Sequence, residues 1–150
     1  IQCAVCTLIS IKLYEKIKKI TPERKKAFEY VEKFDFNAWS ETLREFLGKG
    51  AESMIALEEK EQKYDIESHR RRFEIIAEKW DNILSIIREE LPSTEELQSL
   101  YTKVGLPKTM AEIGLDEEIL PLTFKASKDI RDKYVLPRLC WDLGIIDEII

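Results

Sequence analysis

The sequence has few of the residues that interrupt regular structure. It contains only five glycines and five prolines among 150 residues. That is too few for a β-rich fold with many tight turns, and also for a disordered chain. Histidine occurs once, at position 69, so the chain cannot assemble a histidine-based metal site. It has no glycine-rich phosphate loop, Ser–His–Asp set or HExxH motif. We therefore predict no catalytic, cofactor-binding or metal-binding residue in this chain.

Cysteine is also scarce, with three residues at Cys3, Cys6 and Cys140. An odd number, with two of them in an apolar run, suits a reducing cytoplasm better than a disulfide framework. The longest apolar run, 1–13, is interrupted by polar residues and is too short for a bilayer, which needs roughly 20 apolar residues. It also lacks the basic start and the cleavage site of a signal peptide. We expect a cytoplasmic protein with no membrane contact.

The composition is that of one globular domain. Hydrophobic residues make up 44% of the chain and charged residues 35%, which is enough to fill and cover a single core over 1–150. The formal net charge of −5 gives an acidic surface that repels nucleic acid, so we expect no nucleic-acid partner.

Helical periodicity runs from end to end and predicts an all-α fold, an orthogonal bundle of about seven or eight helices. The expected helices cover 1–19, 22–33, 37–47, 51–63, 65–91, 94–104, 117–126 and 134–150, with a single turn at 110–113. The cap residues that support these boundaries are Thr21, Asp65, Ser93, Thr109 and Asp116. The first helix is apolar on nearly every side up to Leu13, which predicts a position in the middle of the bundle.

Cys3 and Cys6 form a C-x-x-C pair on one face of the expected first helix. A redox pair or half of a metal site would need this spacing. A metal site also needs a second pair of ligands, and only Cys140 and His69 remain. We therefore favour two small apolar residues at a crowded contact between helices.

The one basic cluster is Ser68-His69-Arg70-Arg71-Arg72. Successive helical residues point about 100° apart, so the three arginines cannot form one phosphate clamp. Glutamates surround them at helical spacing. We favour a solvated face with salt bridges over an anion site for a phosphorylated substrate or partner, and we expect His69 to be a surface or helix-turn residue.

The three tryptophans, Trp39, Trp80 and Trp141, lie on apolar stripes. One lies in each third of the chain, which favours core packing over an aromatic ligand cage. The sequence contains many pairs of Asp and Glu residues, but none of these pairs stands out by lying among apolar residues.

Two segments carry a family resemblance. The tail, from Gly105-Leu-Pro-Lys-Thr-Met-Ala-Glu-Ile-Gly-Leu-Asp116 through Ile130-Arg-Asp-Lys-Tyr134 and Leu139-Cys-Trp-Asp-Leu-Gly144, resembles the end of glycerol-1-phosphate dehydrogenases. The middle, from Tyr64-Asp65 to Trp80-Asp81, is similar to the same group. These enzymes belong to the superfamily of iron-containing alcohol dehydrogenases, glycerol dehydrogenases and dehydroquinate synthases.

The beginning of the sequence is also similar to this superfamily. In the family a helix opens with a His-Gly-x-Gln-like motif, whose histidine binds the catalytic metal. Here Gln2 is followed by small residues and by Thr7-Leu8, which would place that histidine two residues before Ile1. Cys3, Ala4 and Cys6 depart from the family's preference for Val and Gly.

The resemblance implies a helical domain like the C-terminal domain of the dehydroquinate synthase-like fold. It implies NAD(P) and a divalent metal (Zn, Fe or Ni) in the complete protein, with a small phosphorylated polyol as substrate and a nucleotide-binding domain as the missing partner. The chain itself would hold no cofactor and would not be active alone. Whether the complete protein is a homo-oligomer stays open.

Three alternatives also stay open. The first is a dehydrogenase of glycerol or another polyol from the same superfamily. The second is a stand-alone helical interaction module without chemistry. The third is an RNA-binding module acting through the arginine cluster. It predicts steeply salt-dependent binding, and the acidic balance argues against it.

Overall fold

A computed structural model describes all 150 residues and confirms the all-α fold, with nine α-helices, three short 3-10 turns and no strands. The helices are α1 (Gln2–Ile17), α2 (Arg24–Glu32), α3 (Phe36–Leu47), α4 (Ala51–Glu61), α5 (Ile66–Glu78), α6 (Trp80–Glu90), α7 (Thr94–Val104), α8 (Leu120–Ser127) and α9 (Leu136–Asp142). The 3-10 turns cover Gly48–Gly50, Ala111–Ile113 and Glu117–Ile119.

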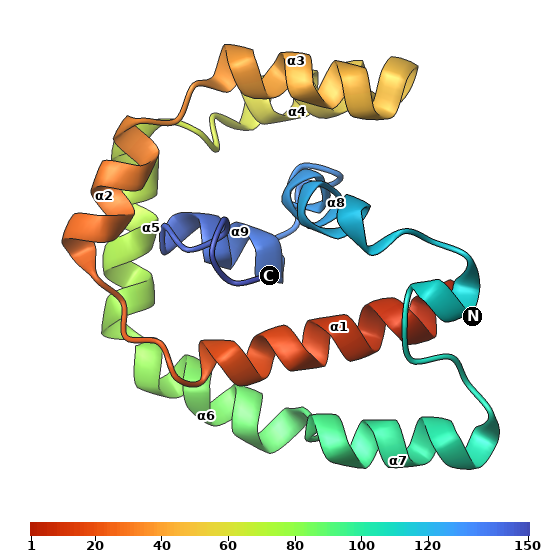
Figure 1. Ribbon diagram of the computed structural model, residues 1–150. Helices are drawn as coiled ribbons and strands as arrows, with labels where there is room; N and C mark the ends of the chain where they lie inside the picture. Colours follow the sequence, from red (N-terminus) through yellow and green to blue (C-terminus); the bar gives the residue numbers. More distant parts are fainter.

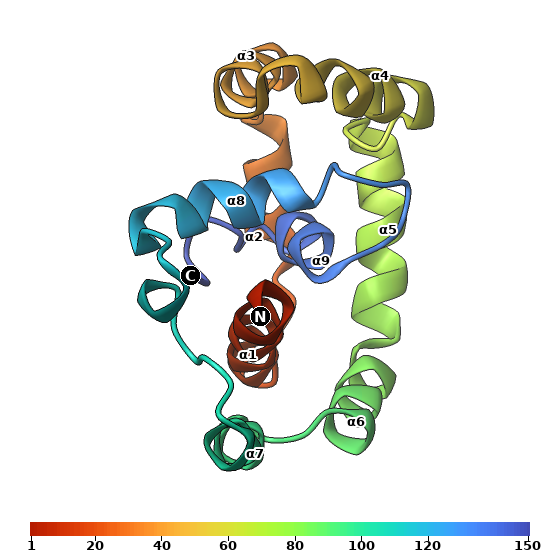
Figure 2. The same ribbon diagram turned by 90° about the vertical axis from the view of Figure 1, so that its right-hand side faces the viewer.

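The helices form a frame around a central group (Figure 1). The α3–α4 hairpin lies on one side of the frame, α2 and α5 on the next, and α6 and α7 on the third. Helices α1, α8 and α9 lie inside it, and both views show α9 between α5 and α8 (Figure 2). Helix α1 packs on α7, and α9 contacts α2, α5 and α8. No helix combines the length and the apolar character that crossing a membrane would require.

Most of the expected caps are present. Asp65 accepts from the backbone N–H of Ser68, and Ser93 and Glu96 form a reciprocal capping box. Thr109 and Glu112 make the second box, and Asp116 caps the turn that follows it. Thr21 does not cap α2. The chain stays non-helical as it crosses from α1, so α2 begins only at Arg24, after Glu23.

The long helix expected over 65–91 is two helices. It breaks at Lys79, whose φ of −96° and ψ of 10° leave the helical region. The break turns α6 so that Trp80 reaches the same core as Phe73 and Ile76 of α5. The indole Nε1 of Trp80 donates a hydrogen bond of 3.0 Å to the carbonyl of Ile20, which holds the turn in place. This long-range contact has no local sequence signal.

The tail expected to be helical over 134–150 is helical only as α9. Gly144 adopts a left-handed conformation with φ 68°, and the chain then turns against α2. A Cβ atom at this position would lie 3.0 Å from the carbonyl oxygen of Lys26 and from Cβ of Tyr30. Only glycine combines this backbone conformation with such a close approach.

Most of the buried apolar residues form two separate clusters. The main core contains 18 buried residues drawn chiefly from α1, α2, α5, α6 and α9. The hairpin core contains five, namely Leu43, Ala51, Met54, Ile55 and Ala126. Helix α9 belongs wholly to the interior, since every residue from 136 to 146 is buried. The two cores meet at charged side chains and at the rings of Phe36 and Tyr64, whose centroids are 4.9 Å apart.

Candidate functional site

The cysteine pair is not at a helix contact. Cys3 and Cys6 are both exposed, because α1 turns Val5, Leu8 and Ile11 toward its neighbours and the cysteines lie on the other side. The prediction of a crowded contact is therefore wrong, and the first turns of α1 have one exposed face. Cys140 is buried, and burial raises the pKa of its thiol to about 12.

The arginine cluster divides between surface and interior. Arg71 is exposed, as expected, and Arg70 forms surface ion pairs with Glu67 and Glu32. Arg72 instead extends inward to Asp142, with a distance of 3.0 Å between Nη2 and Oδ1. His69 is fully buried, so its expected surface position is wrong. Both residues face the interior because this side of α5 packs on α2 and α9.

A buried ionic cluster joins the two cores. Its centre is Arg138 of α9, whose Nη2 lies 2.6 Å from the Glu58 carboxylate and 2.7 Å from that of Asp129. Lys128 pairs with Asp129 at 3.0 Å. These four side chains are at most 3% exposed. Glu58 comes from α4 and Arg138 from α9, so the cluster fastens the hairpin to the main core.

Aromatic rings surround these charges. The ammonium of Lys128 lies 3.8 Å from the ring centroid of Trp39, and the guanidinium of Arg138 lies 4.9 Å from that of Tyr64. The indole of Trp39 and the hydroxyl of Tyr64 both donate to Asp129. Desolvation lowers the pKa of Lys128 to about 8, and burial together with Asp129 raises that of Tyr64. The ring of Trp39, which was expected to act in packing alone, therefore also contacts an internal cation, as does the ring of Tyr64.

A second group of polar side chains meets at Asp142. The Asp142 carboxylate accepts from Arg72 and from the hydroxyl of Tyr134, which is 2.8 Å away. The Nε2 of His69 lies 2.9 Å from the Asp142 carbonyl oxygen. A carbonyl only accepts, so Nε2 carries the hydrogen and Nδ1, which has no partner, does not. Desolvation lowers the pKa of His69, so the ring is neutral.

The buried members of these groups, including Glu58, Asp129, Arg138 and Asp142, have their polar contacts with one another and with neighbouring side chains. Some partners lie far apart in the sequence, as with Glu58 and Arg138, which are separated by 80 residues, whereas Lys128 and Asp129 are neighbours. The sequence reasoning missed all of them. One signal was present: Asp142 interrupts an apolar run that continues from Leu139 to Ile146, and a lone carboxylate in such a setting is buried with a partner.

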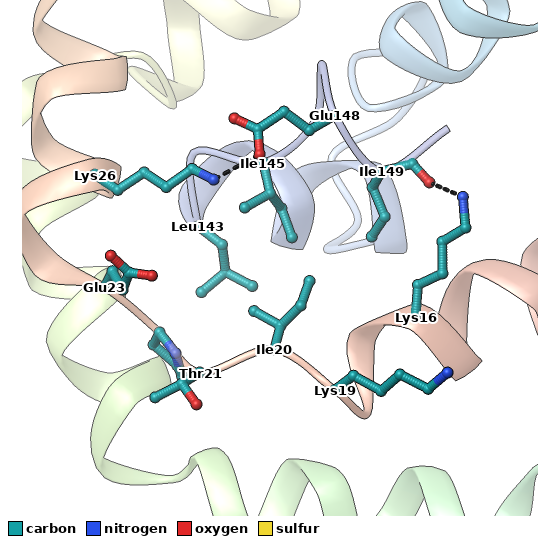
Figure 3. Close-up of a pocket in the computed structure, with 11 residues that line it drawn as sticks. Lys16, Lys19, Ile20, Thr21, Glu23, Lys26, Leu143, Ile145, Glu148 and Ile149 are labelled. Carbon is teal, nitrogen blue, oxygen red and sulfur yellow. Dashed lines mark hydrogen bonds and ion pairs between the residues drawn. The ribbon is translucent and has the colours of Figure 1, made fainter.

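An open hollow lies between the end of α1, the start of α2 and the segment after α9 (Figure 3). Its volume is about 500 Å³. Side chains of Ile20, Leu143, Ile145 and Ile149 converge on it. Its rim carries three lysines, Lys16, Lys19 and Lys26, and two glutamates, Glu23 and Glu148. This combination of an apolar floor and a charged rim is typical of small-molecule sites.

No set of three His, Cys, Asp or Glu side chains is grouped so that it could hold a metal ion. Comparison with known proteins gives no match: no family model, no curated protein and no solved structure matches the chain.

Proposed function

We propose that the chain is the helical domain of a glycerol-1-phosphate dehydrogenase-like oxidoreductase that uses NAD(P) and a divalent metal. The resemblance of Ile130–Tyr134 and Leu139–Gly144 to that family carries the proposal. The second of these segments supplies Trp141 and Asp142, which are fully buried, and Tyr134 of the first is exposed but donates to the Asp142 carboxylate. The resemblance over Leu139–Gly144 therefore falls on buried residues on which the helical fold depends, as expected for a shared domain.

The exposed face of α1 supports the same proposal. Gln2, Cys3, Cys6 and Thr7 of the family-like segment are exposed, while Val5 and Leu8 anchor the helix. Such a face can line a cleft against a nucleotide-binding domain. It offers no group of metal ligands, so in this proposal the metal is held by residues outside the chain. A bound divalent ion would polarise the alcohol oxygen during hydride transfer to the nicotinamide.

The contribution of this chain is then to form one wall. Helix α1 is fixed by its contacts with α7, including a hydrogen bond of 3.0 Å from the Tyr101 hydroxyl to the Ala4 carbonyl. That bond holds the first turns of α1 in position. A rigid wall orients the substrate and excludes water from the reacting atoms.

A second candidate is a stand-alone helical interaction module. Exposed isoleucines favour it, since Ile1 is 80%, Ile75 61% and Ile86 60% exposed. A dehydrogenase of glycerol or another polyol from the same superfamily remains the enzymatic alternative.

The test is an activity assay on the complete open reading frame that contains this chain. We expect NAD(P)H-dependent reduction of dihydroxyacetone phosphate to sn-glycerol 1-phosphate when Zn²⁺, Fe²⁺ or Ni²⁺ is supplied. Preference for dihydroxyacetone or glycerol would favour the polyol alternative. A reading frame that begins at this chain, together with no activity on any of these substrates, would overturn the enzyme proposal and favour the module.

The chain by itself is the matched control. We expect it to be inactive and to bind neither zinc nor nicotinamide nucleotide tightly, because it has a single buried histidine and no phosphate loop. A dissociation constant of about 1 μM or tighter for either ligand in calorimetry would contradict the proposal.

A further inference from the structure

The end of α1 and the residues just after it carry lysines that form no ion pair with a carboxylate. Lys12, Lys16 and Lys19 follow one another at helical spacing, and none of them forms an ion pair. The nearby Glu15 carboxylate accepts instead from the backbone N–H of Thr94. On α2 the pattern differs, since Lys25 pairs with Glu29 and Lys26 with Glu148. A chain of net charge −5 thus keeps a positive strip beside the hollow of Figure 3.

Only some of the charged side chains on the rim of the hollow have partners within the protein. Lys26 is held by Glu148 at 2.6 Å, and Lys16 donates to the carbonyl of Ile149 at 2.6 Å. Lys19 has no hydrogen-bond or ion-pair partner and extends outward from the rim (Figure 3). A smaller hollow of about 250 Å³ on the other side of Lys16 is lined by Lys12, Lys108 and one glutamate, Glu117, so lysines outnumber carboxylates there as well.

The floor restricts the kind of ligand that fits. Leu143, Ile145 and Ile149 belong to the main core and point toward the hollow. No aromatic side chain lines it, so a nucleotide base would have nothing to stack on. No polar side chain lies on the floor, so a polyol would lose its hydrogen bonds with water without replacement. The floor therefore fits a ligand with an aliphatic body.

The rim restricts the head group. Three lysines against two glutamates leave one positive charge. A nucleotide or a polyphosphate would bring several negative charges close to Glu23 and Glu148, which costs free energy through like-charge repulsion. A ligand with a single carboxylate near Lys16 and Lys19 would neutralise the one excess positive charge of the rim.

We propose that this hollow binds a monocarboxylate with an aliphatic tail, its carboxylate at the rim where Lys16 and Lys19 leave the end of α1 and its tail against Ile20, Leu143, Ile145 and Ile149. The site is independent of the proposed dehydrogenase function, because it uses the end of α1 opposite to Cys3 and Cys6.

The test uses sodium octanoate and the chain labelled with ¹³C at its isoleucine δ-methyl groups. We expect saturable shifts of the Ile20, Ile145 and Ile149 methyls, with a dissociation constant of about 0.1–1 mM for so small a ligand. The methyls of Ile75 and Ile86, which are exposed elsewhere, should not move. Octan-1-ol keeps the aliphatic tail but lacks the carboxylate, and butyrate keeps the carboxylate but has a shorter tail. Each should bind more weakly than octanoate.

Two charge reversals sharpen the test. Lys19→Glu should weaken octanoate binding by about tenfold at low salt, since it replaces an attractive charge at the rim by a repulsive one. Lys60→Glu makes the same change in net charge at an exposed position on α4 and should leave binding unchanged. Equal effects of the two reversals, or shifts spread over all isoleucines, would overturn the proposal. So would the absence of any shift of Ile20, Ile145 and Ile149 at about 10 mM octanoate.

Discussion

The main core and the hairpin core differ in what makes them stable. The main core gathers 18 buried apolar residues, with Trp141 fully enclosed. The hairpin core has five, and Ala126 is the only one that α3 and α4 do not supply. So small a core does not sustain two helices by itself. The hairpin is held by the contact of Glu58 and Trp39 with Arg138 and Asp129, so its position depends on charges buried in the other region.

The largest effect is expected at the junction. Arg138→Met would leave the Glu58 and Asp129 carboxylates buried without their shared partner. Removing one member of a buried ion pair costs about 3–5 kcal/mol of folding free energy. Amide hydrogen exchange should accelerate most in α3 and α4, because the hairpin loses its attachment.

The control for this substitution is Arg44→Met, which removes an exposed pair with Glu41 and Glu52. Exposed pairs contribute about 1 kcal/mol or less. The double variant Glu58→Gln/Arg138→Met should recover part of the loss. If Arg138→Met melts at the same denaturant concentration as the unmodified chain, the cluster does not hold the hairpin.

Substitutions that create a cavity in one core at a time test whether the two regions unfold independently. Trp80→Ala should destabilise the protein by about 3–5 kcal/mol and raise exchange throughout the main core. Leu43→Ala should cost about 2–3 kcal/mol and raise exchange in α3 and α4 alone. Arg71→Ala, at an exposed position of α5, should change stability by less than about 0.5 kcal/mol. Uniform exchange changes in both cavity variants would mean that the two cores unfold as one unit.

The smallest expected effect is the change in the free energy of unfolding with pH that arises from proton binding to His69, which is buried beside the main core. Desolvation lowers its pKa below the ordinary value near 6.5, so the unfolded chain binds more protons than the folded one. The contribution of His69 is therefore present above pH 6.5 and is lost as the pH falls, with a slope of at most about 1.4 kcal/mol per pH unit.

Denaturant melts between about pH 7.5 and 5.5 measure this effect, with His69→Gln as reference. The burial that raises the pKa of Glu58 acts in the opposite direction, so the relevant quantity is the difference between the two proteins. A difference that does not change with pH would show that His69 does not take up a proton on unfolding.

Local signals in the sequence were read correctly where a few neighbouring residues determine the structure. The capping box of Ser93 and Glu96, the stop at Gly48 and the core position of Trp80 are examples. Positions that depend on distant partners were missed. Asp129 is buried in contact with the indole of Trp39, which lies 90 residues away. Arg72 points inward because its guanidinium donates to the Asp142 carboxylate.

The hollow could not be predicted for the same reason. Its lining comes from residues 16–26 and 143–149, and nothing in either segment indicates that they meet. The exposed side of α1 was missed because Cys3 and Cys6 count as apolar in a helical pattern. The resemblance to a dehydrogenase domain stays a prediction, to be tested by activity.

The burial of α9 sets the order of events during synthesis. The residues that close the main core, 136–146, are made long after α1, which they help to cover. Ribosomes add about 5–20 residues per second. The apolar side of α1 therefore waits several seconds before its cover arrives. During that interval the nascent chain exposes the apolar side of α1 to water.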